Sequence, residues 1–417
     1  MATLRYALMA AAMIAAPVFT SPAAAAPNGG PTGDLKLERM VMLMRHSVRP
    51  PTKSPATPAG TTAQPWSSWT TPYGELTQHG ADGSRLMGRY NRTFLGARGL
   101  MPREGCAPAG DIVVWASGKS RAIRTAESFV DGLQPGCGLA VDHPRTEADD
   151  PVFHPSEGLD GDLALKASQR LKPGVANEAR IHAADFAVLQ KVLGCDPATK
   201  AGCGIAQRPS SLKANVGDSA DLEGALSIAS TAGQTVLLEY VEGKPMEEVG
   251  WGRASKADIQ TMLRFHPVKF HYEVGSPYVA QRYAAPVARR ILSALNGEAG
   301  TGKLTLLVGH DTNIAALRAF LDAHFTIADY PRDDPPPGGA MGFELLRDGG
   351  GKAFVRAFYT AQSMDQLREL QPLTASNPPA YAYFPIPGCG VRGEPTVCPL
   401  ETFQKIVGGK LTSPAQH

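Results

Sequence analysis

The amino-acid sequence predicts an α/β protein, in which a large α/β sandwich domain carries an inserted, mainly α-helical domain. Three short apolar runs at 39–44, 112–115 and 304–308 are typical of buried strands, and an amphipathic helix follows each of them along the chain. Residues 150–272 show mainly helical patterns instead, separated by loops rich in Gly, Pro and Ser. A chain of 417 residues is longer than a single hydrophobic core usually accommodates, so two domains are expected.

The first part of the α/β domain, predicted over 27–149, contains two strand–loop–helix units. After the first apolar run, a loop rich in Pro, Ser and Thr covers 50–72, and a turn then leads into a helix with Thr77 as its N-cap. The second strand is followed by a helix from Ser120 onward. Each unit places a loop at the carboxyl end of a strand, where open α/β sheets bind their ligands.

The chain beyond residue 150 contains the helical insertion and then the second part of the α/β domain, in which strands and helices alternate again. Within the insertion, the patterns predict helices at 175–193, 220–241 and 256–266. The second part of the α/β domain, 273–417, begins with a long helix, and the apolar run LTLLV leads directly into another amphipathic helix. The segments MGFELLRD and KAFVRAFYT alternate like two antiparallel strands joined by a Gly-rich turn, and the C-terminal region is rich in loops.

The first 26 residues have the pattern of a secretory signal peptide. Arg5 gives a positive start, an apolar stretch runs from Tyr6 to Phe19, and small residues from Ala23 to Ala26 provide a cleavage region. The apolar stretch is too short to span a bilayer, so we expect cleavage rather than anchoring. The expected mature protein is therefore periplasmic or secreted.

Cysteine usage agrees with export. The six cysteines form three pairs of neighbours in the sequence, which are Cys106 with Cys137, Cys195 with Cys203, and Cys389 with Cys398. Local pairing is the simplest of the possible connectivities, and an oxidising compartment would favour disulfides. A zinc site is the weaker alternative, because the sequence has no C-x-x-C pair and no histidines clustered near these cysteines.

The overall charge argues against some classes of partner. The formal net charge is +2 and no block of Lys or Arg stands out, so we expect neither nucleic acid nor a membrane as a partner. Any strong positive field must be local. We expect a monomer that acts on a small molecule.

Positively charged and acid–base side chains gather at the predicted strand ends. They are Arg45, His46, Arg49 and Lys53 after the first strand, Arg121 after the second, and His310 and Asp311 after the third. If these three corners meet, one pocket holds three guanidinium groups, two imidazoles and one carboxylate. Such a meeting is expected, because the carboxyl ends of parallel strands lie at one edge of the sheet.

This combination of side chains favours chemistry on a phosphate ester. Guanidinium forks match phosphate oxygens in a bidentate manner, and three of them would neutralise both a phosphate dianion and the charge on its oxygens during transfer. An imidazole can attack phosphorus directly, and a carboxylic acid placed opposite can protonate the departing alkoxide. Because the arginines supply the electrostatic stabilisation, we expect neither a metal nor a cofactor.

Two other kinds of site are disfavoured. In the segment 143–154, four residues could suggest a metal site together, which are His143, Asp149, Asp150 and His154. Their spacing matches no metal-site pattern, so we interpret the segment as a solvated loop. A serine hydrolase is disfavoured because Ser117 and Ser120 have no nearby His/Asp arrangement and no G-x-S-x-G turn.

Two motifs far apart along the chain resemble those of a known family. RHSVRPP at 45–51 resembles the R-H-G-x-R-x-P signature of the histidine acid phosphatases, and GHDTN at 309–313 resembles their downstream H-D motif in the form seen in bacterial phytases. The stretches GELTQHG, DDPVFHP, GWGR and PPPGGA are also similar to that branch. The resemblance runs over nearly the whole expected mature chain.

The resemblance implies both a fold and a function. The fold is a phosphoglycerate-mutase-like α/β domain with an inserted helical domain, and the function is that of an exported acid phosphomonoesterase. His46 would be the nucleophile that becomes phosphorylated, and Asp311 would protonate the leaving group. The remaining motif residues would bind the phosphoryl group, namely Arg45, Arg49, Arg121 and His310. Lys53 would line the substrate pocket, and the three local cysteine pairs match bridges of that branch.

Three positions depart from the family pattern. Ser47 stands where the signature has glycine, a residue used where backbone bends or approaches closely. Gln234 and Ser117, both expected in the substrate pocket, stand where phytases often have Glu and Asp. A phosphomonoesterase is therefore better supported than phytate as its substrate. A phosphatase for sugar phosphates such as glucose-1-phosphate and a non-catalytic phosphate-ester binding protein are the alternatives.

Overall fold

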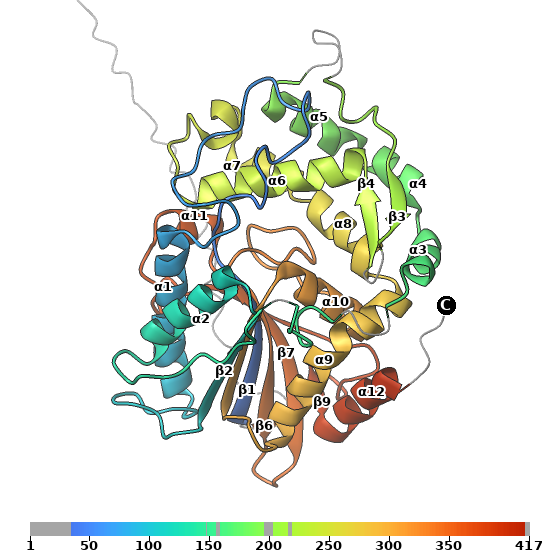
Figure 1. The fold of residues 1–417 in the computed structure, drawn as a ribbon. Coiled ribbons are helices and arrows are strands. Elements are labelled where there is room, and N and C mark those ends of the chain that lie inside the picture. The colour runs from blue at the N-terminus through green and yellow to red at the C-terminus, as the bar shows by residue number, and fades with distance from the viewer. Residues whose placement is uncertain (1–34, 147, 156–158, 196–202, 216–218, 413–417) are drawn as a thin grey trace, which may run out of the picture.

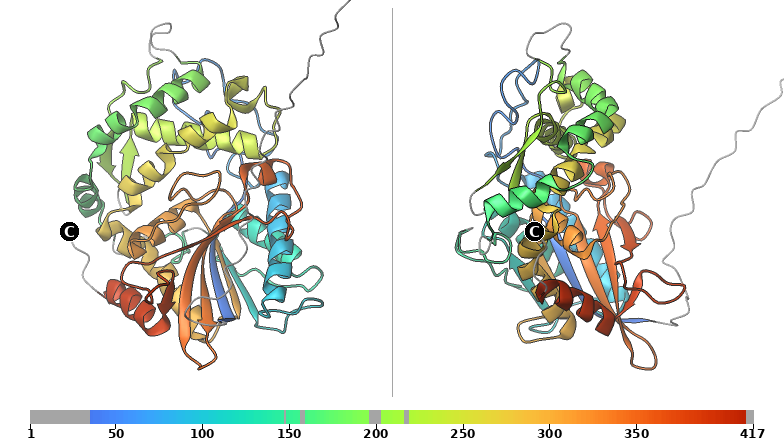
Figure 2. Two further views of the ribbon diagram at one scale, coloured as in Figure 1. Left: turned by 180° about the vertical axis from the view of Figure 1, so that it is seen from behind. Right: turned by 90° about the vertical axis from the view of Figure 1, so that its right-hand side faces the viewer.

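The computed structural model describes residues 35–146, 148–155, 159–195, 203–215 and 219–412. The expected signal peptide lies outside the described residues. Within them, a mixed β-sheet has helices on both faces, and a mainly helical region lies at one end of the strands (Figure 1). The two views in Figure 2 show that this helical region is stacked on the sheet end rather than beside it.

The sheet and the helices that cover it come from two stretches of chain. The first stretch contains β1 (Lys36–Arg45), α1 (Gln78–Ala97), β2 (Ile112–Ala116) and α2 (Ser120–Leu133). The second contains α9 (Pro277–Asn296), β5 (Leu304–Gly309), α10 (Asp311–Leu321), β6 (Ala340–Arg347), β7 (Ala353–Ala361), α11 (Met364–Arg368), β8 (Ala380–Phe384), β9 (Val397–Pro399) and α12 (Leu400–Thr412).

The helical region comes from the residues between these stretches. It contains α3 (Gly161–Gln169), α4 (Val175–Ile181), α5 (Ala183–Leu193), β3 (Ser211–Ala214), β4 (Ala220–Glu223), α6 (Ala225–Val241), the 3₁₀ helix η1 (Val249–Gly252), α7 (Lys256–Met262) and α8 (Phe265–Val274). The predicted domain boundary at 272 falls inside α8, and the division of the chain into domains stays a prediction.

The order of strands brings three chain corners to one sheet edge. The order is β2-β5-β1-β6-β7-β8, with β9 also paired to β7. Strands β1, β2 and β5 run parallel to one another, whereas β6 runs antiparallel to β1. The carboxyl ends of the three parallel strands and the amino end of β6 therefore lie together, and the helical region covers this edge (Figure 1).

The sheet separates two hydrophobic cores, which explains the apolar runs in the sequence. Met40, Met42 and Met44 on one face of β1 pack in a cluster with α1 and α2. Val41 and Leu43 on the other face belong to a larger cluster with α9 and α10, which continues into the helical region. Strand β5 is buried along its whole length because both of its faces are covered.

Most of the predicted elements are confirmed. The helix α1 begins after its N-cap Thr77, whose hydroxyl accepts a hydrogen bond from the backbone N–H of Gly80 over 2.9 Å. Strands β6 and β7 pair antiparallel as expected. The three disulfides join the neighbouring cysteines in the predicted pairs. None of the helices in the described part of the chain is long and apolar enough to cross a bilayer.

The helices predicted over 175–193 and 256–266 are each divided in two, as α4 and α5 and as α7 and α8. Two further segments differ more from the prediction. The helix predicted over 220–241 begins only at Ala225, because 220–223 form β4, which pairs with β3 in a hairpin. Gly224 separates the strand from the helix at a φ of +80°, and a Cβ there would lie 1.9 Å from the carbonyl oxygen of Pro209. The C-terminal region is less loop-rich than predicted, since it contains β8, β9, α11 and α12.

Candidate active site

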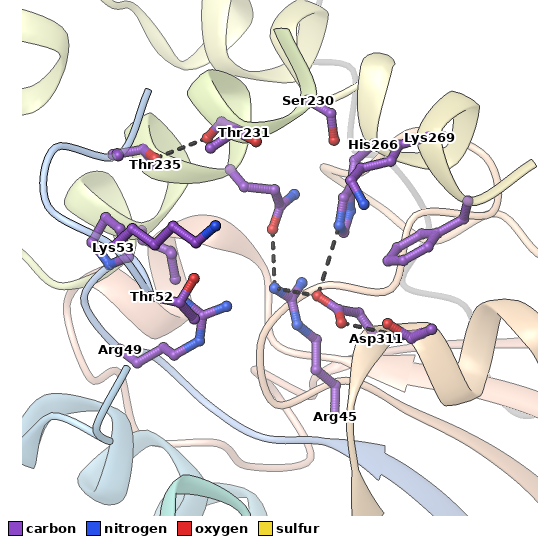
Figure 3. Close-up of a pocket in the computed structure, with 16 residues that line it drawn as sticks. Arg45, Arg49, Thr52, Lys53, Ser230, Thr231, Thr235, His266, Lys269 and Asp311 are labelled. Atoms are coloured by element: carbon purple, nitrogen blue, oxygen red, sulfur yellow. Dashed lines mark hydrogen bonds and ion pairs between the residues drawn. The ribbon is translucent and has the colours of Figure 1, made fainter. Parts of the chain in front are cut away.

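A cavity of about 410 Å³ opens where the sheet edge meets the helical region (Figure 3). The sheet edge and the loop after β1 contribute charged side chains to its wall: Arg45, Arg49, Lys53 and Asp311. Helices α6 and α8 contribute a mostly polar wall: Ser230, Thr231, Gln234, Thr235, His266 and Lys269. The predicted pocket residues Lys53 and Gln234 thus line the cavity.

The strand ends bring the two sequence motifs into contact. Arg45 ends β1 and pairs in register with Gly309, the last residue of β5. The backbone N–H of His46 then donates to the carbonyl oxygen of Gly309 over 2.9 Å. As a result, the rings of His46 and His310 lie with their centroids 5.6 Å apart, although 264 positions separate them in the sequence.

His46 is held as a neutral imidazole with a defined tautomer. Its side chain is buried, and Nδ1 lies 2.9 Å from the carbonyl oxygen of Ser47. Because a carbonyl oxygen can only accept, Nδ1 holds the proton and the lone pair remains on Nε2. Burial lowers the pKa of His46 well below its usual value, and the nearby guanidinium groups of Arg49 and Arg121 lower it further.

Arg45 is fixed by three partners around its guanidinium group. Nη1 donates to the carbonyl oxygen of Pro335 over 2.6 Å, and Nη2 donates to Oε1 of Gln234 over 3.0 Å. Nη2 also lies 2.9 Å from Oδ2 of Asp311, which forms an ion pair. The contact with Asp311 can be followed in Figure 3. The group is therefore preoriented toward the cavity.

The other arginines crowd the same space. Burial lowers the pKa of Arg49 to about 9, and the positive charges of Arg121 and Arg45 contribute to this shift. Nη2 of Arg121 lies 3.5 Å from Nδ1 of His310. Such crowding of like charges is unfavourable until an anion binds among them.

His310 stands at the N-terminus of α10 and is also neutral. Because the guanidinium of Arg121 can only donate, Nδ1 of His310 accepts and Nε2 holds the proton. Burial lowers the pKa of His310 well below its usual value, and Arg121 and His154 add to the effect. The backbone N–H of His310 donates to Oδ1 of Asn313 over 2.9 Å, which caps the helix.

Asp311 is the carboxylate of the site, and its surroundings favour the ionised form. Burial alone would raise the pKa of Asp311, but the positive groups around it, Arg45 first among them, together outweigh burial and hold the pKa well below its usual range. Oδ1 accepts a hydrogen bond from the backbone N–H of Thr312 over 3.0 Å. Oδ2 faces Arg45 on one side and Nε2 of His266, 3.7 Å away, on the other.

Ser117 and His154 lie behind His310. The hydroxyl of Ser117 is 3.1 Å from Nε2 of His310 and 3.3 Å from Nε2 of His154, and the two imidazole nitrogens are themselves 3.1 Å apart. Ser117 is fully buried and is not among the side chains that line the cavity. It contacts the site through His310 instead.

The interpretation of 143–154 as a solvated loop is wrong for its last residues. Asp150 is buried, and its side chain accepts from the backbone N–H groups of Gly118, Val152 and Phe153. These bonds fold the segment back onto the end of β2 and place His154 against His310. His143 and Asp149 are exposed as predicted.

Ser47 fits the signature loop without backbone strain. Ser47 is not among the described residues with a positive φ, so its backbone conformation does not require glycine. The left-handed conformation occurs at Gly338 on the opposite loop, at a φ of +70°. A Cβ at Gly338 would lie 3.5 Å from Oγ of Ser47, so a glycine there leaves room beside the serine hydroxyl.

Sequence reasoning missed four contributors to the site, which are His154, His266, Lys269 and Asp334. His266 and Lys269 lie on one face of α8, three residues apart, and this spacing could have indicated that they point to a common surface. His154 and Asp334 stand in loops with no spacing pattern. In the described residues, no group of three or more His, Cys, Asp or Glu side chains could hold a metal ion.

Comparisons with known proteins agree with this geometry. Residues 36–186 match the model of the histidine phosphatase superfamily (branch 2). The chain is 31% identical over 403 residues to phytase AppA of Escherichia coli (strain K12), an alignment that covers 90% of this chain and 92% of the relative. The chain belongs to the histidine phosphatase superfamily, branch 2.

Other members of the superfamily are similar over the same length. Glucose-1-phosphatase of Salmonella typhimurium is 28% identical over 384 residues, which cover 89% of this chain and 92% of the relative. The Hafnia alvei phytase in complex with tartrate superposes with a TM-score of 0.85 at 32% identity, over 94% of this chain and 99% of that one. These findings confirm the predicted fold class and the predicted enzyme class, a histidine acid phosphatase that hydrolyses phosphate esters.

Proposed function

We propose that the protein is an exported acid phosphatase of phytase type that forms a phosphohistidine at His46. One observation supports this most directly. The unprotonated Nε2 of a neutral, buried imidazole lies among three guanidinium groups, and the carboxylate of Asp311 lies 2.9 Å from one of them. A nucleophile, a cradle for negative charge and an acid are the three parts that phosphoryl transfer needs.

In the first half of the proposed reaction, His46 Nε2 attacks phosphorus while the ester P–O bond breaks. Arg45, Arg49, Arg121 and His310 hold the phosphoryl oxygens and neutralise the charge on them. Asp311 gives its proton to the departing oxygen. In the second half, water attacks the phosphohistidine, Asp311 takes a proton from this water, and phosphate leaves with the imidazole restored.

The low pKa of Asp311 in the empty pocket is compatible with an acid role. The ion pair with Arg45 is the main cause of that low pKa. An arriving phosphate dianion competes for Arg45 and adds negative charge beside Asp311. Both changes favour the protonated carboxyl group, so the acid forms when the substrate is in place.

The cavity wall supports phytate as the substrate. Lys53 and Lys269 face the cavity beyond the arginines, and hydroxyl groups of Ser230, Thr231 and Thr235 lie between them (Figure 3). A substrate with several phosphate groups would use cations that a single phosphate cannot reach. A phosphatase for glucose-1-phosphate is the second candidate, because a relative at 28% identity has that name.

The substrate is tested by a phosphate-release panel with purified mature protein. We expect release at acidic pH from 4-nitrophenyl phosphate, phytate and glucose-1-phosphate, with the highest kcat/KM for phytate and no change on adding EDTA. A higher kcat/KM for glucose-1-phosphate would favour the second candidate. Acid quenching during turnover should trap phosphate on His46. If neither turnover nor trapped phosphate is found, the protein would be a non-catalytic phosphate-ester binding protein instead.

The setting of the enzyme is part of the same proposal. Three disulfides and the N-terminal sequence support a periplasmic or secreted monomer. Fractionation of expressing bacteria should place activity outside the cytoplasm, and size-exclusion chromatography with light scattering should give the mass of one chain. Activity confined to the cytoplasmic fraction, or the mass of a dimer, would contradict this setting.

A further inference from the structure

A buried carboxylate that the mechanism does not use lies behind His266. Asp334, in the loop before β6, has a side chain with 0% exposure, and its Oδ1 is 2.6 Å from Nδ1 of His266. Its Oδ2 has no hydrogen-bond partner among the residues that the structure describes. Burying a carboxylate is costly unless a cation or several donors compensate it. An amide could accept the same hydrogen bond at lower cost, so the negative charge itself calls for an explanation.

His266 connects this carboxylate to the proposed acid. Its Nδ1 faces Asp334, and its Nε2 faces Oδ2 of Asp311 at 3.7 Å (Figure 3). The same Oδ2 is held by Arg45 in the empty site. When phosphate takes over Arg45, Oδ2 loses that partner, and the imidazole is the nearest remaining group that can give it a proton.

We propose that Asp334 is a positioning residue that orients His266 and stabilises it as an imidazolium, so that His266 supplies the proton that Asp311 passes to the leaving group. This inference rests on the proposed function. A carboxylate on one ring nitrogen fixes the orientation of the ring and stabilises the cationic form, as in other carboxylate–histidine pairs. The pair spans the two regions, since His266 is on α8 and Asp334 is at the sheet edge.

The protons balance over one turnover. As the ester binds, the Nε2–H bond of His266 breaks and an O–H bond forms at Oδ2 of Asp311, which leaves a neutral imidazole with its remaining proton toward Asp334. Asp311 then protonates the leaving oxygen as the P–O bond breaks. In the second half, the attacking water gives its proton to Asp311, which returns it to Nε2 when phosphate leaves and Arg45 pairs with Oδ2 again.

The charged surroundings of His266 fit this assignment. Carboxylates face it from the loop before β6 and from α10, and the cations lining the cavity include Arg45 from the sheet edge and Lys269 from α8 itself. Two buried tyrosines behind the pair, Tyr330 and Tyr359, stay neutral, because burial raises the pKa of each well above its usual value. The ring of Phe270 packs 4.5 Å from the imidazole between centroids and shields the pair from bulk water.

The inference is tested by leaving-group dependence in Asp334→Asn. An alkyl phosphate such as glycerol-2-phosphate needs a proton on its leaving group, whereas 4-nitrophenyl phosphate does not. We expect kcat for the alkyl ester to fall about 10- to 100-fold and kcat for the aryl ester to fall less than about threefold, with KM nearly unchanged for both. In the background of Asp311→Asn, the added Asp334→Asn change should cost nothing further, because the two act in series.

A matched control is the neighbouring Asp333→Asn. Oδ2 of Asp333 also lies 2.6 Å from Nδ1 of a histidine, His324, which is outside the cavity. This variant should keep wild-type rates with both esters. If Asp334→Asn does not fold, His266→Gln takes its place, since glutamine has similar reach but no transferable proton, and it should show the same preference for the aryl ester.

The outcomes separate the inference from the function beneath it. Equal losses with both esters in Asp334→Asn and His266→Gln, no loss in either, or additive losses in the double variant would overturn the inference. If Asp311→Asn itself lowers kcat equally for both esters, the acid role in the proposed function fails as well. If Asp311→Asn lowers kcat more for the alkyl ester than for the aryl ester, while Asp334→Asn and His266→Gln do not, the proposed function stands and only the inference fails.

Discussion

The two regions that meet at the cavity contribute different parts of the site. The sheet edge contributes the groups proposed to react or to hold phosphate, and the paired strands fix them, as the contact of His46 with Gly309 shows. The helical region contributes Gln234, His266 and Lys269 from α6 and α8, which form the opposite wall. The chemistry is thus attached to the rigid sheet, and the surface that meets the rest of the substrate is attached to helices.

This difference suggests how members of one superfamily differ in substrate. Side chains on a helix face can change without disturbing a strand ladder, whereas a change at the end of β1 or β5 would alter the attack itself. Relatives named as phytase and as glucose-1-phosphatase align over the same length of this chain. We therefore expect changes on the sheet side to abolish turnover, and changes on the helical side to alter selectivity.

Replacing the nucleophile should have the largest effect. His46→Ala should lower kcat about 10⁴-fold or more for every ester, because it removes the imidazole whose free Nε2 lone pair is the proposed nucleophile. Initial rates with 4-nitrophenyl phosphate measure this, and circular dichroism checks that the variant is folded. Retention of most of the activity in this variant would contradict a covalent mechanism at His46.

Removing the acid should have the next largest effect and should depend on the substrate. Asp311→Asn should lower kcat about 10²- to 10⁴-fold for alkyl phosphates, because general acid catalysis is lost. The loss with aryl phosphates should be much smaller, since their leaving groups depart unprotonated. A plot of rate against leaving-group pKa for wild type and variant measures the difference, and parallel lines would contradict the acid role.

A charge change on the helical wall should affect binding rather than chemistry. Lys269→Gln removes an ammonium group that lines the cavity, lies 5.9 Å from the centroid of the Phe270 ring and pairs with Glu273. We expect KM for phytate to rise about 3- to 10-fold with kcat almost unchanged, and no change with 4-nitrophenyl phosphate. Lys405→Gln, an exposed lysine on α12, is the matched control. An equal effect on both substrates would contradict a selectivity role.

The smallest effects concern stability, and the two regions should respond to pH with opposite sign. The pKa of His46 is lowered by burial, so below its unfolded value of about 6.5 only the unfolded chain gains the proton. Stability then falls by about 1.4 kcal/mol for each pH unit until the folded pKa is reached. In the helical region, the pKa of His182 is raised by its bonds to Glu178 and Asp185, so its contribution is complete below about 6.5 and is lost as pH rises.

Urea unfolding of two variants tests this sign difference. His46→Gln should reduce the loss of stability between about pH 6.5 and 5, because the destabilising proton uptake is removed. His182→Gln should destabilise the protein more at about pH 5 than at about pH 9. A pH dependence of the same sign in both variants would contradict the assignment.

The sequence predicted the sheet side of the molecule better than the helical side. The end of a strand can be recognised in the sequence because an apolar run stops at a charged residue, as at Arg45. The parallel order of the strands then brings such ends together. The β3–β4 hairpin was missed because Ala220–Glu223 continues into a helical pattern, and only the glycine after it marks the break. No local pattern distinguishes Gly224 from glycines in ordinary loops.

Within the site, sequence reasoning found residues in motifs and missed residues held by tertiary contacts. The role of a buried polar side chain such as Asp334 depends on a partner 68 positions away, and neither residue stands at a helix cap or metal spacing. His154 was assigned to solvent because the spacing of the possible ligands in its segment matches no metal-site pattern. The bonds that turn its segment inward come from Asp150, a residue that looks like any other loop acid in the sequence.

The ion pair between Arg45 and Asp311 has a consequence for the end of the catalytic cycle. An enzyme built to hold phosphate with several guanidinium groups risks inhibition by its own product. Here the carboxylate of Asp311 lies 2.9 Å from the guanidinium of Arg45 and can form an ion pair with it as inorganic phosphate departs. We expect this internal competitor to lower the affinity of the enzyme for free phosphate, and so to favour release of the product over its retention.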